Sequence, residues 1–380
     1  MTSHVAGAPF SRSDTSPLGR WWWTVDRWIL AAIGLLIAFG VVLTLAAGPA
    51  AADRLGYESF HFVRRQLTVL PVALALLFAV SMLRPLTVRR LAVVVFALGL
   101  LLALLAALVG PEVNGARRWL TFAGMSLQPS ELLKPAFVVV AAWMFAEQRS
   151  RANFPGDVIA TALCCLVVGV LLLQPDLGMV VVILAAWCVQ FFVAGLPLTW
   201  VALVGVIGLF GIATAYFVFP HVASRVDRFL DPASGDSYQV DRSLEAFVNG
   251  GLLGRGPGEG VIKVRLPDAH NDFIFAVAGE EFGLIACIVI VALFGVIVLR
   301  GIGRMLQESS VFIVLAVTGL LVQFGLQAII HMASSVHLIP TKGMTLPFIS
   351  YGGSSLLASA FGIGMVLALT RRRAGPSGVW

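Results

Sequence analysis

The chain has 380 residues, of which 59% are hydrophobic and only 12% are charged, and its formal net charge is +6. Soluble globular proteins are about 25% charged, so the composition excludes a water-soluble domain and predicts that lipid is the solvent for much of the surface. The basic residues are dispersed between apolar runs, and no basic helix with interleaved aromatic residues is found, which argues against nucleic acid as a partner.

Apolar runs of membrane-spanning length follow a polar start. Residues 1–20 are rich in Ser, Thr and Pro and are expected to form a disordered tail without a cleavable signal, and Trp21, Trp22 and Trp23 then fit an interfacial anchor. About ten spans are predicted, at 27–47, 66–83, 91–109, 131–146, 158–173, 178–194, 198–219, 273–299, 309–335 and 350–370. We therefore expect an all-α integral membrane protein with a single transmembrane domain, 21–371, and a tail, 372–380.

An even number of spans places both termini on one side, and the arginines identify that side. With a cytoplasmic N-terminus, the inner segments hold thirteen arginines and five acidic residues. Lys and Arg in short loops accumulate on the cytoplasmic face, so both termini are expected there. An anionic ligand is one explanation for the basic residues that remain near the outer face, namely Arg64, Arg65, Arg117, Arg118, Lys134 and Lys342.

The connection between the seventh and eighth spans, residues 220–272, is predicted to be a large extracytoplasmic loop. Loops longer than about 15 residues are usually functional or disordered. This loop is too rich in apolar residues and Gly for a solvated linker, and it predicts a short amphipathic helix near 243–248 followed by a packed turn. The alternating glycines from Gly254 to Gly260 lack the Lys-Ser/Thr pair of a phosphate-binding loop, so a structural turn is favoured.

Ionisable residues occur at the outer ends of predicted spans. Glu131 and Lys134 are three residues apart and share a helix face, either as a structural ion pair or as part of a site. Asp176 lies in QPDLG near the hydrocarbon boundary and is either a turn cap or a site residue. The four cysteines all lie inside apolar runs, so neither a disulfide nor a thiolate metal site is expected.

Two further outer segments contain the residues best suited to chemistry. In LPDAHNDFIFAVAGEEFG, Asp272 precedes a long apolar span and follows His270 by two positions, and such a carboxylate can act as a general base or hold a metal. Glu280 and Glu281 point about 100° apart on a helix, which favours a structural role. In PTKGMTLPFISYGGSS, prolines and glycines break helix regularity, and Ser354 and Ser355 offer hydroxyls either to a ligand or to their own helix.

These outer residues favour an enzyme acting on a lipid-linked substrate. Such an enzyme needs cations for phosphates, a carboxylate base and a groove open to lipid. A transporter is expected to place polar residues near the midplane on paired broken helices, and no convincing internal repeat is found here. A purely structural scaffold would explain none of the buried charges.

The chain resembles the SEDS family of FtsW and RodA proteins in GARRWL, QPSELLK, QPDLG, LPDAHNDFIFAVAGEEFG and PTKGMTLPFISYGGSSLL. The last of these is more similar to the division member, FtsW, than to the elongation member, RodA. The resemblance implies a peptidoglycan glycosyltransferase that polymerises lipid II at the outer face of the bacterial cytoplasmic (inner) membrane, at the septum for the division type. It also implies a class B penicillin-binding protein and other division proteins as partners, besides membrane lipids. The alternatives are an elongation-type polymerase and a lipid II flippase.

The resemblance also implies the site residues. The catalytic aspartate of the family motif LPxxHxDF falls on Asp272, and other functional positions fall on Arg118, Glu131, Lys134, Asp176 and Ser354, with Arg65 a weaker correspondence and His270 added as a neighbour of Asp272. Asn271 and Asp268 stand where many members have Thr and Glu, and both keep polarity.

Asp272 is expected to take the proton of the attacking 4-hydroxyl, while Arg118 and Lys134 neutralise the departing pyrophosphate. Mg²⁺ or Mn²⁺ is expected to assist with unassigned ligands, Asp272 being either base or ligand, and no organic cofactor is expected.

Overall fold

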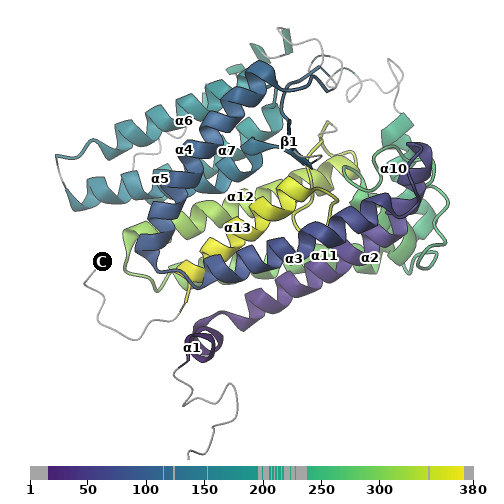
Figure 1. The fold of residues 1–380 in the computed structure, drawn as a ribbon, viewed down its shortest axis with the longest axis horizontal. Helices are drawn as coiled ribbons and strands as arrows, with labels where there is room; N and C mark the ends of the chain where they lie inside the picture. The colour runs from purple at the N-terminus through teal and green to yellow at the C-terminus, as the bar shows by residue number, and fades with distance from the viewer. Residues whose placement is uncertain are drawn as a thin grey trace, which may run out of the picture.

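A computed structural model of the chain describes residues 16–371, apart from Asn114, 123–124, Ala152, most of 196–237, and 341–342. The described part is a bundle of long helices that lie side by side, as Figure 1 shows. The helices are α1 (Pro17–Thr24), α2 (Arg27–Arg54), α3 (His61–Ser81), α4 (Pro85–Val109), α5 (Pro129–Ser150), α6 (Gly156–Leu173), α7 (Leu177–Val193), α10 (Tyr238–Gly250), α11 (Ile274–Met305), α12 (Val311–Ser335) and α13 (Gly353–Leu369). A short antiparallel hairpin pairs β1 (Leu120–Phe122) with β2 (Met125–Leu127), with Leu120 opposite Leu127.

The prediction of an all-α integral membrane protein is confirmed. Within the described residues, seven helices are long and apolar enough to cross a membrane, and α7 and α13 are shorter apolar helices. Each of these corresponds to one predicted span. The seventh predicted span, 198–219, lies mostly outside the described residues.

Helices α5 and α12 form the centre of the bundle. In their apolar windows, 83% of α5 and 72% of α12 is buried, whereas the other long spans bury 28–39% and turn much of their apolar surface outward. Ionisable side chains are costly in contact with lipid tails, so a span that carries them must be enclosed by protein. This explains why Glu131 and Lys134 lie on α5.

Both described ends of the chain lie at the same end of the bundle, because Arg371 Nε donates a hydrogen bond to Thr24 Oγ1 at 3.0 Å. Two predictions for this end are each corrected in part. Helix α1 begins at Pro17, within the segment expected to be disordered. Trp21 is not an interfacial anchor, since it is buried and its Nε1 donates to Ser81 Oγ at 2.8 Å.

At the opposite end, the 220–272 connection contains the predicted amphipathic helix, which forms α10 and is longer than predicted. Its Ser243 hydroxyl donates to the Ser335 carbonyl of α12 at 2.6 Å, so α10 is fixed on the bundle. In Figure 1, α10 lies at the outer end of α2 and α11.

Helix α11 is interrupted at Gly283, whose φ of 74° breaks the helical geometry. The break exposes backbone groups that the loop satisfies: the N–H groups of Leu284 and Ile285 donate to carbonyls of residues 251–252, and the carbonyls of Glu280 and Glu281 accept from the N–H groups of residues 255–256. A Cβ on Gly283 would lie 2.4 Å from the Leu252 carbonyl oxygen. The glycine-rich run is therefore a packed structural turn, as predicted.

Candidate functional site

Asp272 ends the extracytoplasmic loop immediately before α11. Its backbone N–H donates to the Asp268 carbonyl at 3.0 Å, in a turn where Asp268 has a φ of 51°. Asp272 is half-buried, and a Cβ on Gly343 would lie 3.1 Å from its Oδ2. The absence of a side chain at Gly343 thus lets the backbone at this residue approach the carboxylate.

The loop that carries Asp272 is fastened to the segment before α13. The Tyr351 N–H donates to the His270 carbonyl at 3.0 Å, and Ser350 Oγ donates to the Asn271 carbonyl at 2.8 Å. Ser350 Oγ also accepts the N–H of Leu346 at 2.8 Å. The two outer motifs that the sequence marks as most unusual are therefore parts of one site. The described residues of the broken segment are largely buried by protein, as its prolines and glycines require.

His270 is largely enclosed by protein, and its predicted contact with substrate stays a prediction. Its side chain is only 7% exposed, and its ring stacks on Phe62 with centroids 4.3 Å apart, while Tyr351 packs edge-on against the same Phe62. Burial lowers the pKa of His270 below its ordinary value of 6.5, although the charge of Asp268 opposes this shift. His270 is accordingly a packing residue behind Asp272.

Replacing His270 with Phe is expected to weaken the pH dependence of thermal stability on the acidic side. Because the folded state favours the neutral imidazole, its stabilisation is complete above the ordinary pKa and is lost as pH falls through the lowered value. Melting temperatures measured from about pH 7.5 to about pH 5 should fall more steeply for wild type than for His270→Phe. Equal slopes for the two proteins would contradict a buried, neutral His270.

Arg65 lies one helical turn after Phe62 on α3, beside the same aromatic group. Its side chain hydrogen-bonds with that of Tyr351, and its Nη2 lies 3.4 Å from Ser126 Oγ of the hairpin. Arg65 is half-buried. It therefore remains a candidate for binding an anionic group near Asp272.

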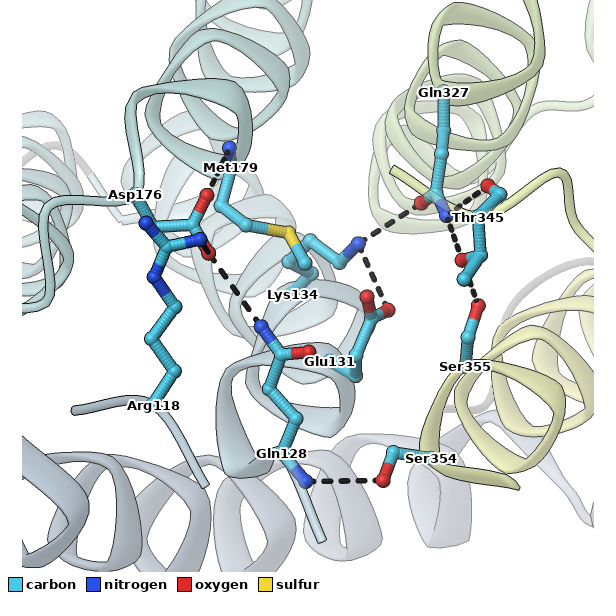
Figure 2. A network of polar contacts seen from close by, with 10 residues as sticks. All are labelled: Arg118, Gln128, Glu131, Lys134, Asp176, Met179, Gln327, Thr345, Ser354 and Ser355. Carbon is cyan, nitrogen blue, oxygen red and sulfur yellow. Dashed lines mark hydrogen bonds and ion pairs between the residues drawn. The ribbon is translucent and has the colours of Figure 1, made fainter. Parts of the chain in front are cut away.

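A second polar network lies between α5, α12 and α13, as Figure 2 shows. Lys134 Nζ is 3.0 Å from Glu131 Oε2 and donates to Gln327 Oε1 at 2.9 Å. The Gln327 amide donates to the Thr345 carbonyl at 3.0 Å, and the Thr345 hydroxyl bonds with Ser355. The network thus connects the ion pair on α5 to the segment that begins at Gly343.

Lys134 and Glu131 lie below the surface, with 1% and 5% of the residue exposed. The Lys134 ammonium contacts Glu131 and Gln327, and its predicted contact with pyrophosphate stays a prediction. The cavity that Glu131 and Gln327 help to line has a volume of about 20 Å³, which accommodates water but not a sugar. The pair therefore holds the site together from within.

Arg118 and Asp176 meet at the turn between α6 and α7. Arg118 donates to the carbonyls of Gln174 and Pro175 at 2.8 and 2.6 Å, and its Nη1 lies 3.7 Å from Asp176 Oδ2. Asp176 also accepts the N–H of Met179 at 3.3 Å, so it caps α7 as well as pairing with Arg118. The structure thus confirms Asp176 as a turn cap, and its role as a site residue stays a prediction.

Ser354 connects this turn to α13. Its hydroxyl accepts the backbone N–H of Gln128 at 3.0 Å, and the Gln128 side chain reaches toward Asp176 in Figure 2. Ser354 is buried, so its hydroxyl serves a contact between segments. Among the predicted outer cations, Arg64 and Arg117 are exposed and pair with Glu58 and Glu112, whereas Arg65 and Arg118 are half-buried; Lys342 lies outside the described residues.

Several residues of the site were not predicted from the sequence. Gln327 carried a usable signal, because an amide inside an otherwise apolar span is expected to have a partner. Phe62, Tyr351 and Thr345 carried none, since aromatic and hydroxyl residues are common at the ends of spans.

The described residues do not form a cage for a metal ion. Among them, no three His, Cys, Asp or Glu side chains are grouped in a way that could hold one. Asp176 pairs with Arg118, and Glu131 pairs with Lys134, so neither is suited as a ligand.

Comparison with known proteins gives consistent matches along the chain. Residues 26–375 match the family model of FtsW, RodA and SpoVE, described as cell cycle protein. A probable peptidoglycan glycosyltransferase FtsW of Caulobacter vibrioides is 45% identical over 379 residues, covering 100% of this chain and 97% of the relative. A probable peptidoglycan glycosyltransferase FtsW of Saccharophagus degradans is 36% identical and covers 88% and 89% of the two chains.

Solved structures are also similar. A chain in a structure that describes the structural coordination of polymerization and crosslinking by a peptidoglycan synthase complex aligns with a TM-score of 0.74 and 30% identity, covering 92% of this chain and 98% of that one. The rod shape determining protein RodA of Thermus thermophilus aligns with a TM-score of 0.68 and 29% identity, covering 92% and 97% of the two chains.

Proposed function

This chain belongs to the FtsW, RodA and SpoVE family of cell cycle proteins, and we infer that it is a peptidoglycan glycosyltransferase that makes glycan strands in septal cell-wall synthesis. The position of Asp272 is the observation that links this activity to a particular site. This half-buried carboxylate ends the extracytoplasmic loop, lies against Gly343, and is backed by a polar network across α5, α12 and α13.

Asp272 is proposed as the general base. The donor is the growing glycan, activated at its anomeric carbon by polyprenyl pyrophosphate, and the acceptor is the 4-hydroxyl of lipid II N-acetylglucosamine. The acceptor oxygen forms the new glycosidic bond while its proton passes to Asp272 and the bond to pyrophosphate breaks. A positioned base contributes about 10²–10⁴-fold to such a transfer.

The departing pyrophosphate requires cations, and Arg65 and Arg118 are proposed for this role. Both are half-buried at the outer end of the bundle, and guanidinium groups bind phosphate oxygens through paired N–H donors. Arg118 is oriented by the carbonyls of Gln174 and Pro175. The fixed orientation reduces the loss of side-chain entropy on binding.

The proposed setting is the outer face of the bacterial cytoplasmic membrane at the division septum. A class B penicillin-binding protein that cross-links the strands is proposed as the partner, together with other division proteins. Support comes from the similarity to a chain of a peptidoglycan synthase complex that couples polymerization and crosslinking.

The function is tested by incubating the purified protein and its presumed partner with lipid II and separating the products by size. Glycan chains longer than one disaccharide unit are expected. If lipid II instead crosses vesicle bilayers without forming chains, the protein is a flippase and the assignment is wrong. The concentration of the site at one end of the bundle favours the polymerase, because a flippase needs polar groups along a transmembrane path.

Removal of divalent cations is expected to reduce polymerisation, and Mg²⁺ or Mn²⁺ should restore it. Since the described residues offer no ligand cage, the cation is proposed to arrive on the pyrophosphate of the substrate. Isothermal titration should accordingly detect no tight cation binding to the protein alone. Tight binding without lipid II, or full activity in EDTA, would contradict this prediction.

A further inference from the structure

The carboxylate of Glu280 binds the part of the extracytoplasmic loop that leads to Asp272. It accepts hydrogen bonds from three consecutive backbone N–H groups, those of residues 261–263, at 2.7 to 2.9 Å. The Asn249 side chain on α10 donates a fourth at 2.9 Å. Glu280 is 0% exposed, so these donors take the place of the water that a buried carboxylate would otherwise require.

Consecutive backbone N–H groups that converge on one point form an anion-binding nest. Here the anion is a side chain of the same protein, supplied by the first, fully buried part of α11. Because the donors are main-chain groups, the carboxylate fixes the path of the loop backbone and not merely one side chain. The nest therefore acts as an internal attachment point for the loop.

The hydrogen bonds between residues 261–263 and Glu280 join the two ends of a closed stretch of chain, here called the ring, and Asp272 lies near its middle. The bonded residues are 17 to 19 positions apart in sequence. Within the ring, the N–H of Leu266 donates to the Ile262 carbonyl at 3.0 Å, and that of Asp272 donates to the Asp268 carbonyl at 3.0 Å. Leu266 is itself buried. These local hydrogen bonds restrict the conformational freedom of the backbone between the nest and Asp272.

The neighbouring carboxylate secures the same stretch of loop. Lys263 Nζ pairs with Glu281 and donates to the Gly258 carbonyl at 3.0 Å, and both charged side chains are buried. Lys263 is therefore held by its backbone at Glu280 and by its side chain at Glu281. The two glutamates point to different groups, as their spacing on a helix requires.

We propose that Glu280 is a positioning residue for glycosyl transfer, which holds Asp272 in place beside Gly343 through the backbone of residues 261–263. The proposal rests on the function inferred above, since it takes Asp272 as the reacting group. Glu280 itself contacts no substrate and acts through the loop.

Glu280→Gln is the substitution that tests this proposal most directly. It keeps the size of the side chain, but one of its two terminal atoms becomes a donor. In either orientation the new NH₂ group faces backbone N–H donors, at Lys263 or at Val261 and Ile262. Glu259→Gln is the matched control, because Glu259 lies on the same loop and is exposed.

Polymerisation by Glu280→Gln is expected to show a kcat about 10- to 100-fold below wild type, as displacement of a reacting group by about 1 Å can cost this much. The KM for lipid II should stay within about threefold, because the proposed phosphate contacts are elsewhere. Hydrogen exchange should accelerate at the amides of residues 261–263, while α5 and α12 stay protected. The Glu259→Gln control should match wild type.

A wild-type kcat for Glu280→Gln would overturn the proposal, and so would a joint loss of kcat, substrate affinity and protection across the whole bundle. If Glu280→Gln does not fold, Asn249→Ala removes a single donor to the same carboxylate and should give a smaller kcat loss with the same KM pattern. The outcomes also separate the two inferences. Activity in Asp272→Ala would refute the proposed mechanism, whereas an inactive Asp272→Ala beside a fully active Glu280→Gln would refute only the role of Glu280.

Discussion

Asp272→Ala is expected to reduce glycan polymerisation by about 10²–10⁴-fold, the contribution of a positioned general base. The carboxylate is half-buried, so its removal should leave only a small void and little loss of stability. Asp272→Asn keeps the shape without the basic oxygen and should be nearly as inactive. Both variants should bind lipid II about as tightly as wild type, which a fluorescent lipid II binding assay would measure.

Asp268→Asn is the matched control for this prediction. Asp268 lies in the same turn, is exposed, and has a positive φ of 51° that Asn also tolerates. It should polymerise lipid II at close to the wild-type rate. Normal polymerisation by folded Asp272→Ala would remove the general base from the mechanism and leave the reaction to other groups.

The sequence predicts the membrane fold and the end of the bundle where the site lies, because both depend on patterns along the chain. Apolar runs set the spans, and polar residues at successive outer ends must meet when the helices are bundled. Arg118 and Asp176 illustrate this, since their segments are far apart in sequence and are joined by hydrogen bonds and an ion pair.

The pattern of apolar and polar residues along the chain does not show how deeply a given side chain is buried. Lys134 was expected at phosphate and His270 at substrate, yet both are buried behind the surface that carries Asp272. A position on a helix face specifies direction but not which side chains from other helices cover it. Gln327 on α12 contacts Lys134, and Phe62 on α3 stacks on His270. Each of these partners comes from a distant part of the chain.

Local backbone geometry is also hard to predict from hydrophobicity. Gly283 lies inside the apolar run 273–299, which the sequence predicts as a single span. The structure breaks the helix there and supplies replacement partners from residues 251–256. The hydrogen bonds with residues 251–256 make this break favourable, and hydrophobic periodicity does not predict such contacts.

Lys134→Met is expected to lower the free energy of unfolding by about 3 kcal/mol, because it leaves the Glu131 carboxylate buried without its cation. The distance of 3.0 Å and the near-complete burial of both groups place this pair among those for which removal of one partner is costly. Thermal or denaturant unfolding in detergent would measure the loss. Arg64→Met serves as the control, since Arg64 pairs with Glu58 on the exposed surface and should cost less than about 1 kcal/mol.

The double variant Glu131→Leu with Lys134→Met separates stability from activity. Replacing both members of a buried pair by apolar residues of similar size is often neutral, so its stability should return to within about 1 kcal/mol of wild type. Polymerisation should nevertheless remain at least about tenfold reduced, because Gln327 loses the ammonium that orients its amide toward Thr345. Recovery of full activity along with stability would show that the pair only maintains the fold. A stable but inactive double variant would show that the network on α5 and α12 is needed to hold the segment that begins at Gly343 beside Asp272.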